Sequence, residues 1–344
     1  MRSRVDAVLD EFFGSRLHGA GAEAEGTFDL AEDVRDYVTR GGKRLRPMMC
    51  VVGRHAGGKS AVSDVVLRTA ASLELFHAFT LIHDDVMDRS DLRRGAPTVH
   101  RAVAARHPGH PAREALGTGA AIVAGDLALA WSDELLHTAG LSPAELAAVL
   151  PVIDVMRTEV VHGQYLDLTT RVNVRGGVAA ALRTARYKTA KYTFERPLHL
   201  GAALAGAGEG LRAALSAFAL PAGEAFQLRD DLLGVFGASE RTGKPVLDDL
   251  RQAKPTVLPA LGYQRADIAQ RLVLDTLTGR PELDEHGAER VRRVLRETGA
   301  AEAVEDMIRL RRRQALQALA DAALPAPAAE AARQLLHGVV ERTA

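Results

Sequence analysis

The sequence predicts an all-α protein. Long stretches rich in Ala, Leu, Arg and Glu repeat apolar residues at spacings of three and four, the period of an amphipathic helix, and strand signals are scarce. Segments rich in Gly and Pro separate these stretches at 40–47, 93–97, 106–111 and 237–245. Since no low-complexity linker or fixed repeat divides the 344 residues, we expect a single domain over 1–344.

The expected helices follow in chain order. They are 66–88, 113–138, 144–170, 178–206, 211–234, 288–298 and 301–322. A start signal marks the third of them, with Ser142 as the N-cap, Pro143 at the first helical position and Glu145 three residues after the serine. In the last helix, the run Arg311–Arg313 is expected to lie on a solvated face.

The composition narrows the classes of function. Lys+Arg and Asp+Glu balance at 44 each, so no global charge indicates nucleic acid or an anionic membrane as a partner. The single cysteine, Cys50, excludes an internal disulfide and a cysteine-rich metal site, and suits a reducing cytosol. Acidic residues interrupt the N-terminal segment, and Asp126 interrupts the most apolar window. We therefore expect a cytoplasmic protein without a membrane span.

The stretch TLIHDDVMDRSDLRRG at 80–95 is the first candidate site. On one helix, Asp84 and Asp88 are four residues apart and share a face, whereas Asp85 lies about 100° around from Asp84. Charges this close need a cation, and carboxylates with open positions are typical ligands of Mg²⁺, often together with substrate phosphates. A solvated helix end is the alternative, although an Asp there would oppose the helix macrodipole.

A second acidic pair, Asp230-Asp231, stands near the end of another expected helix in EAFQLRDDLLGVFG. Helices of a bundle can hold metal ions between inward-pointing carboxylates, so two pairs in matching contexts favour one shared metal site. Arginine and lysine in the segments at 41–47, 93–95, 188–189 and 242–244 suit phosphate oxygens, although each taken alone is more often a solvated surface charge. Together, the acidic pairs and the basic segments predict a site in which metal ions bind one diphosphate and basic side chains bind a second.

These residues carry a family resemblance over nearly the whole chain. The motifs are GGKRLRP (41–47), ELFHAFTLIHDDVMD (74–88), LRRG (92–95), GQYLD (163–167), YKTAKYTFERPL (187–198), FQLRDD (226–231) and TGKPVLDDLRQAK (242–254). In order and spacing they resemble the motifs of the trans-isoprenyl diphosphate synthases of the polyprenyl synthetase family. In their residue identities they resemble the geranylgeranyl diphosphate synthases of actinobacterial type. The resemblance implies an isoprenoid-synthase helical bundle with a deep central cavity, and a homodimer.

The resemblance also implies a role for each matching residue. The direct Mg²⁺ ligands match Asp84, Asp88 and Asp230, with Asp85 and Asp231 as their companions. The pocket for the diphosphate of isopentenyl diphosphate matches Lys43, Arg46, His77 and Arg94, and the positions that hold the allylic diphosphate match Arg93, Lys188 and Lys244. Thr189 and Gln227 match polar groups near the reacting carbons, and either Asp248 or Asp249 matches an outer, water-mediated contact.

The implied reaction is a head-to-tail condensation. The allylic diphosphate ionises, the double bond of isopentenyl diphosphate attacks the resulting cation, and no side-chain nucleophile is needed. Phe79 and Phe76 lie five and eight residues before Asp84, so both can face the tail cavity as its floor, or simply belong to the core. In the family that the chain resembles, an aromatic residue at the position of Phe79 and a first motif without a two-residue insertion go with short products. Thr80 is smaller than the aromatic residue that often accompanies C15 products there, so the resemblance implies geranylgeranyl diphosphate (C20) rather than farnesyl diphosphate (C15).

Two rival functions are weighed against this one. A class I terpene cyclase needs a second metal motif built on Asn, Ser/Thr and Glu, but the only asparagine is Asn173 in a VNVRGG turn. A catalytically silent partner subunit would be expected to have lost carboxylates that this chain retains. One departure from the family is Gly234, which stands where many relatives have a third aspartate in the second motif. The primer preference and the dimer interface are not determined by the sequence.

Overall fold

The computed structural model describes residues 1–17, 27–172, 177–237 and 247–341. In these ranges the backbone is almost entirely helical, and the strands are the two-residue β1 (Leu92–Arg93) and β2 (Ala96–Pro97), which pair antiparallel. The expected all-α class is therefore confirmed. Contacts divide the chain into two compact units, one of Met1–Val51 with Ser60–Leu146 and one of Val52–Lys59 with Ala147–Ala344. The single-domain expectation stays a prediction, and the units are described in turn.

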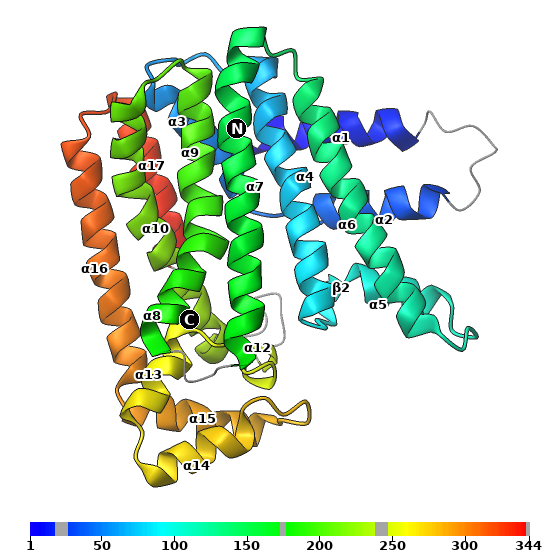
Figure 1. Ribbon diagram of the computed structural model, residues 1–344, viewed down its shortest axis with the longest axis vertical. Helices are drawn as coiled ribbons and strands as arrows, with labels where there is room; N and C mark the ends of the chain where they lie inside the picture. Colours follow the sequence, from blue (N-terminus) through cyan, green and yellow to red (C-terminus); the bar gives the residue numbers. More distant parts are fainter. Residues whose placement is uncertain (18–26, 173–176, 238–246, 342–344) are drawn as a thin grey trace. The chain divides into compact units, whose positions relative to one another are not determined.

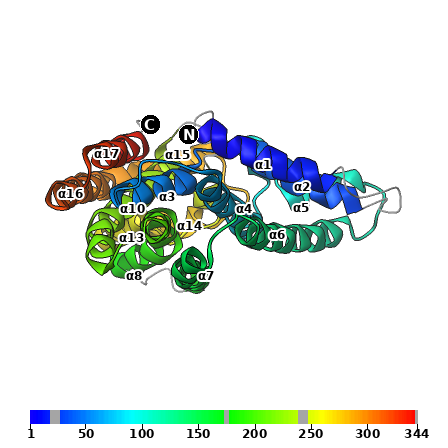
Figure 2. The ribbon, with the colours of Figure 1, turned by 90° about the horizontal axis from the view of Figure 1, so that it is seen from above.

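The first unit is built around two long helices. In chain order its helices are α1 (Arg2–Leu17), α2 (Thr27–Thr39), the part of α3 (Leu45–Ala56) up to Val51, α4 (Asp64–Met87), α5 (Val99–Arg106) and α6 (Arg113–His137). Helices α4 and α6 pack side by side, as Figures 1 and 2 show. Gly125 of α6 allows this approach, because a Cβ there would lie 2.2 Å from the ring of His83 on α4. The apolar run before the acidic motif thus forms the core of this unit.

The second unit contains the longer helical run. Its elements are α7 (Pro143–Val172), α8 (Gly177–Thr184), η1 (Ala185–Glu195), α9 (Arg196–Leu204), α10 (Glu209–Phe236), α12 (Asp248–Arg251), α13 (Val257–Arg265), α14 (Ile268–Leu277), α15 (Glu285–Glu297), α16 (Ala300–Asp321) and α17 (Ala326–Val340). Helix α10 packs against η1 and against α16. The expected start of α7 is confirmed, because the Glu145 amide donates to Ser142 Oγ at 3.3 Å and Ser142 N–H donates to the Glu145 carboxylate at 2.9 Å.

The expected helix 178–206 is continuous but changes its winding. Its middle part, η1, is π-helical, a form that is rare and often found at functional sites. Glycines lie on both sides of it: a Cβ at Gly163 of α7 would lie 2.4 Å from the backbone nitrogen of Lys188, and one at Gly223 of α10 would lie 2.5 Å from Cα of Ala190. Both neighbouring helices can approach η1 only because these two residues lack side chains.

Ion pairs fix η1 to its neighbours. Glu224 on α10 is 2% exposed and accepts from Arg186 of η1 at 2.7 Å and from Arg311 of α16 at 2.5 Å. On the other side, Glu159 of α7 accepts from Lys191 and Arg196 at 2.6 Å each. The expectation of a solvated face at 311–313 is therefore wrong for Arg311, because the buried charge of Glu224 draws its guanidinium inward.

Within the part of the chain that the structure describes, two helices are long and apolar enough to cross a membrane by length and composition alone. They are Asp64–Asp88 and Arg113–His137. In the first, 67% of the most apolar window is buried inside the protein, as expected for a core helix of a folded domain. In the second, α6, only 33% of that window is buried.

Candidate active site

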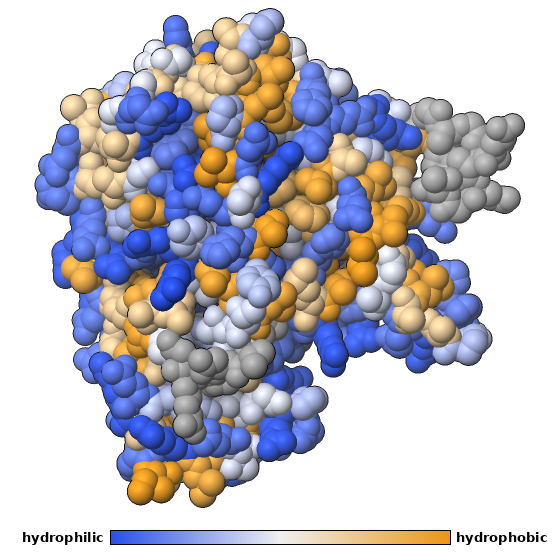
Figure 3. Space-filling view, in the orientation of Figure 1, coloured by the Kyte–Doolittle hydropathy of each residue, from blue (hydrophilic) through white to orange (hydrophobic). Residues whose placement is uncertain are grey.

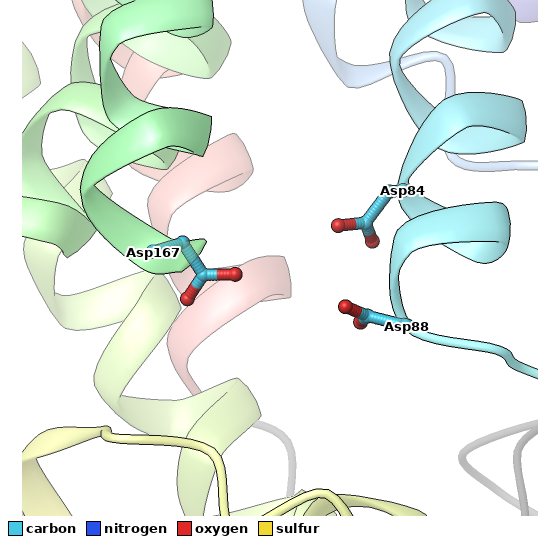
Figure 4. A group of neighbouring side chains, drawn as sticks. All are labelled: Asp84, Asp88 and Asp167. Carbon is cyan, nitrogen blue, oxygen red and sulfur yellow. The ribbon is translucent and has the colours of Figure 1, made fainter. Parts of the chain in front are cut away.

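The first acidic motif lies at the C-terminal end of α4. Asp84 and Asp88 are one helical turn apart, and their carboxylates extend to the same side of the helix (Figure 4). Both are buried, with 9% and 5% of their surface exposed. A solvated helix end therefore does not describe this motif. Two buried carboxylates on one face offer oxygen atoms of the kind that a hard divalent cation prefers.

The adjacent Asp85 points elsewhere. It is 1% exposed, its Oδ1 accepts from Arg93 Nε at 2.8 Å and its Oδ2 accepts from the Tyr37 hydroxyl at 2.8 Å. Arg93, from β1, also donates to Asp84 at 3.3 Å. Burial lowers the pKa of Arg93, but the charges of Asp85, Tyr37 and Asp84 outweigh it and the pKa is raised. This guanidinium thus stays charged beside the acidic motif.

Two of the predicted isopentenyl diphosphate residues, Arg46 and Arg94, lie near a third, His77 of α4. The pKa of His77 is lowered well below its usual value, first by burial and then by the positive charges of Arg46, Arg94 and Arg93. Lys43 is exposed in the segment just before α3, and Arg46 lies in the first turn of α3. Three separate sequence segments therefore supply one electropositive cluster within the first unit.

The backbone and side chains of the segment 41–44 fix the position of this cluster. Gly42 has φ +148°, and a Cβ there would come within 3.2 Å of the Arg94 guanidinium, which donates to the Gly41 carbonyl. Arg44 is 5% exposed and donates to Asp6 at 2.7 Å and to buried Glu74 at 3.0 Å. Because Arg44 is tied inward in this way, the segment that carries Lys43 is anchored to α1 and α4.

The second unit presents Lys188 and Thr189 on η1. Lys188 Nζ donates to Asp167 of α7 at 2.9 Å, and Asp167 is the third residue drawn in Figure 4. Thr189 Oγ1 donates to Gln227 Oε1 of α10 at 2.5 Å. Gln227 Nε2 in turn donates to Asp231 Oδ1 at 2.8 Å, one helical turn further along α10. The sequence singled out Thr189, Gln227 and Asp231 separately, and the structure joins them in one hydrogen-bond chain.

The rest of the second motif lies beside α12. The Asp230 side chain is partly exposed, whereas Asp231 is buried. Burial, with the nearby charges of Asp249 and Asp230, raises the pKa of Asp231 to about 8. Asp249 faces this motif: its Oδ2 lies 1.9 Å from where a Cβ of Gly234 would be, and its Oδ1 lies 3.1 Å from Lys254 Nζ. The predicted diphosphate residue Lys244 lies outside the described residues.

The predicted chain-length residues lie on α4 before the acidic motif. Phe76 is 2% exposed, and its ring centroid is 5.4 Å from that of the partly buried Phe79. Phe79 also contacts the His83 ring at 4.9 Å. Thr80 donates to the His77 carbonyl at 2.9 Å, the back-bond common for helical threonine. The two rings thus form one aromatic cluster, and its role as a floor stays a prediction.

Sequence reasoning gave no role to several residues that the structure connects to the candidate site. Tyr37 and Glu74 lie 48 and 30 positions from the partners that they bind, and no local pattern distinguishes them from core residues. Asp167 and Gly163 had a signal, since both belong to the GQYLD motif. Lys254 likewise stands in the quoted segment 242–254.

A comparison with known families matches this arrangement of motifs. The model of the polyprenyl synthetase family matches residues 29–296, which include both acidic motifs. The chain belongs to the polyprenyl synthetase family. It is therefore a prenyltransferase, and the expectation drawn from the motifs is confirmed. The family depends on a divalent metal, and the paired carboxylates of Asp84 and Asp88 fit such an ion.

Members of the family with known products resemble the chain along most of its length. A geranylfarnesyl diphosphate synthase of Aeropyrum pernix is 32% identical over 310 residues, which are 89% of this chain and 92% of the relative. A geranylgeranyl diphosphate synthase of Methanosarcina mazei is 32% identical over 76% of this chain and 74% of the relative.

A solved structure of the family shares both the fold and much of the sequence. It is a geranylgeranyl pyrophosphate synthase of Corynebacterium glutamicum in complex with isoprenyl diphosphate and magnesium. The TM-score is 0.92 and the identity 40%, over 99% of this chain and 97% of that protein. This similar protein is actinobacterial, as the residue identities of the motifs predict.

Proposed function

We propose that this prenyltransferase condenses isopentenyl diphosphate head to tail with an allylic diphosphate, in the presence of Mg²⁺, and that its main product is geranylgeranyl diphosphate. The observation that carries the proposal is the electropositive cluster around His77, on the same helix as the paired carboxylates of Asp84 and Asp88. An enzyme that joins two diphosphates needs both: carboxylates for the ions on one, and basic side chains for the other.

In this proposal each basic set holds one substrate. Lys43, Arg46, His77 and Arg94 bind the diphosphate of isopentenyl diphosphate, and Arg93, Lys188 and Lys244 bind the allylic diphosphate. Asp84, Asp85, Asp88, Asp230 and Asp231 form the acidic motifs, with Asp84, Asp88 and Asp230 as the residues that hold Mg²⁺. Bound Mg²⁺ supplies charge that stabilises the departing diphosphate.

The side chains then guide the reaction. Arg93 and Lys188 stabilise negative charge as the allylic C–O bond ionises, and the preorganised dipoles of Thr189 and Gln227 face the positive charge on the carbons. Holding both substrates aligned converts the coupling into an effectively unimolecular step. Exclusion of water keeps the allylic cation from hydrolysis. The released diphosphate takes the proton that the coupled product loses.

The product length follows from the aromatic cluster. Phe79 lies five residues before Asp84 on α4 and contacts Phe76, so a prenyl tail that runs along this helix meets a ring rather than open space. Thr80 leaves more room than an aromatic residue would. Farnesyl diphosphate is the second candidate product, because a farnesyl diphosphate synthase of Mycobacterium tuberculosis is 37% identical over 216 residues.

We also propose that the enzyme is a cytoplasmic homodimer. Helix α6 exposes Leu116, Ile122 and Val123 by 38%, 44% and 54%, and apolar side chains crowd the surface over this helix in Figure 3. Apolar side chains that project together from one helix suit an isologous contact with a second copy.

The test is an incubation of the purified protein with Mg²⁺, isopentenyl diphosphate and farnesyl diphosphate, beside an Asp84→Ala control. Products are hydrolysed to alcohols and sized by mass spectrometry. We expect a C20 alcohol that is lost in the control, because Asp84 is a ligand for the ions that hold the allylic diphosphate.

The other outcomes separate the alternatives. A C15 product alone, formed from shorter primers, would retain the reaction but overturn the product length. No elongation with any primer would favour a silent partner subunit, with the departure from the family at Gly234 as the first suspect.

A further inference from the structure

Three aromatic rings follow one another along α4, just before the acidic motif. Phe76, Phe79 and His83 are three and four residues apart, so their side chains project from one stripe of the helix. Phe79 is the middle ring. Its centroid lies 5.4 Å from that of Phe76 and 4.9 Å from that of His83, which it meets edge to face at 67°. A change at His83 therefore acts directly on Phe79.

Helix α6 holds the His83 ring in place. Nε2 of His83 donates to the Ile122 carbonyl at 3.0 Å, which fixes the orientation of the imidazole. Gly125, three residues further along α6, lies against the same ring: a Cβ there would be 2.2 Å from Nε2 and 2.3 Å from Cδ2. The ring therefore occupies space that exists only because residue 125 has no side chain.

The Phe79 ring depends on this neighbour for its own position. Phe76 is 2% exposed and belongs to the core, whereas Phe79 is only partly buried. A partly buried ring can turn to another rotamer wherever neighbouring side chains leave space for it. Since Phe76 is fixed by the core, the place of His83 decides which rotamers Phe79 can adopt.

We propose that His83 is a positioning residue for product length: held against Ile122 and Gly125, its ring keeps Phe79 across the path of the prenyl tail. The inference rests on the proposed function and deepens it, because it names the side chain that keeps the floor of the tail cavity in place. His83 stands next to Asp84 in the sequence, but its ring contacts α6 and acts on the product through Phe79.

The first experiment compares three His83 variants by the length of the alcohols obtained from isopentenyl diphosphate, farnesyl diphosphate and Mg²⁺. His83→Ala leaves space into which Phe79 can turn, so products longer than that of the wild type should appear. His83→Gln can still donate to the Ile122 carbonyl but has no ring, and should resemble His83→Ala. His83→Phe keeps a ring beside Phe79 and should stay closer to the wild-type length. Wild-type length in His83→Ala or His83→Gln would overturn the proposal.

A double variant separates positioning from a general structural role. Phe79→Ala/His83→Ala should give the same product lengths as Phe79→Ala alone, because His83 then has no ring to hold. A purely structural role of His83 would lower the thermal midpoint of His83→Ala and leave its product length unchanged. Longer products in the double variant than in Phe79→Ala would show that His83 itself blocks the tail, which would refute a role through Phe79.

A pair of glycine variants on α6 tests how His83 is held. In Gly125→Ala the imidazole or the helix must move by at least about 0.8 Å, since real Cβ atoms essentially never come within 3.0 Å of such atoms. Movement away from α6 presses the ring toward Phe79, so the share of shorter product should rise. Gly119→Ala is the matched control on the same helix, because a Cβ there meets nothing within 4 Å. Unchanged or longer product in Gly125→Ala would contradict the role of this glycine.

A binding experiment without turnover keeps this inference separate from the proposed function. Calorimetry in Mg²⁺ measures the affinities of unreactive farnesyl and geranylgeranyl thiolodiphosphates. In His83→Ala the ratio of the two affinities should shift by about tenfold toward the longer analogue, the effect of burying about two further methylene groups. An unchanged ratio would overturn the inference. A wild-type protein that binds the analogues but forms no product would contradict the proposed function, while this ratio would still decide the role of His83.

Discussion

Gly163 offers a sharp test of how η1 is positioned, because a single methyl group there would meet backbone. In Gly163→Ala, the new Cβ would lie 2.4 Å from the backbone nitrogen of Lys188 and 2.7 Å from its Cα. Real Cβ atoms essentially never come within 3.0 Å of such atoms, so η1 or α7 must move by at least about 0.6 Å. The shift falls directly on the backbone of Lys188, the residue before Thr189.

The expected loss of stability in Gly163→Ala is much smaller than the expected loss of activity. Alanine gains up to about 1 kcal/mol over glycine inside a helix, whereas overpacking a buried contact costs about 1–3 kcal/mol. The net loss of stability should therefore be modest, about 0–2 kcal/mol. A misplacement approaching 1 Å can cost about 100-fold in rate, so kcat should fall far more than the folded fraction does.

The assay combines urea unfolding, followed by circular dichroism, with incorporation of isopentenyl diphosphate into product. Gly338→Ala is the matched control: it lies in α17 of the same unit, and a Cβ there would meet nothing within 4 Å. We expect the control to be as stable as the wild type or slightly more so, and fully active. Wild-type kcat in Gly163→Ala would refute the view that this glycine sets the place of η1.

Three further predictions concern the acidic motifs and the tail. Phe79→Ala should extend the product beyond C20, as mass spectrometry of the alcohols would reveal; an unchanged length would eliminate the ring as a floor. Gly234→Asp should weaken Mn²⁺ binding rather than restore a third ligand, because its Cβ would displace the Asp249 carboxylate 1.9 Å away; a gain in affinity would contradict this. Because the pKa of Asp231 is raised to about 8, the metal-free folded state binds a proton that the unfolded chain loses near pH 4. The thermal midpoint of the metal-free protein should thus fall as pH rises from about 4 to 8, and Asp231→Asn should flatten that slope.

The residues named as site candidates from the sequence include most of those that the structure connects. Asp84 and Asp88 could be placed on one face because helix geometry alone fixes the angle between residues four apart. Five long helices, α4, α6, α7, α10 and α16, could likewise be placed to within a few residues, since their apolar period and cap signals are local properties of the chain. The 16-residue α1 and the 15-residue α17 were not expected. Short helices such as α5 and α12 were not expected, because few residues of each carry a periodic signal.

The sequence by itself determined the all-α class, the two acidic motifs and the identity of the basic residues, because each depends on neighbours along the chain. Only the tertiary structure decided what Asp85 and Asp231 face, that Asp249 lies beside the second motif, and that Arg311 pairs with Glu224 inside the protein. These contacts join residues up to 87 positions apart. Burial selects the partner of each of these side chains, because a charge that is removed from water needs an opposite charge or a hydrogen bond. That partner can stand anywhere along the chain.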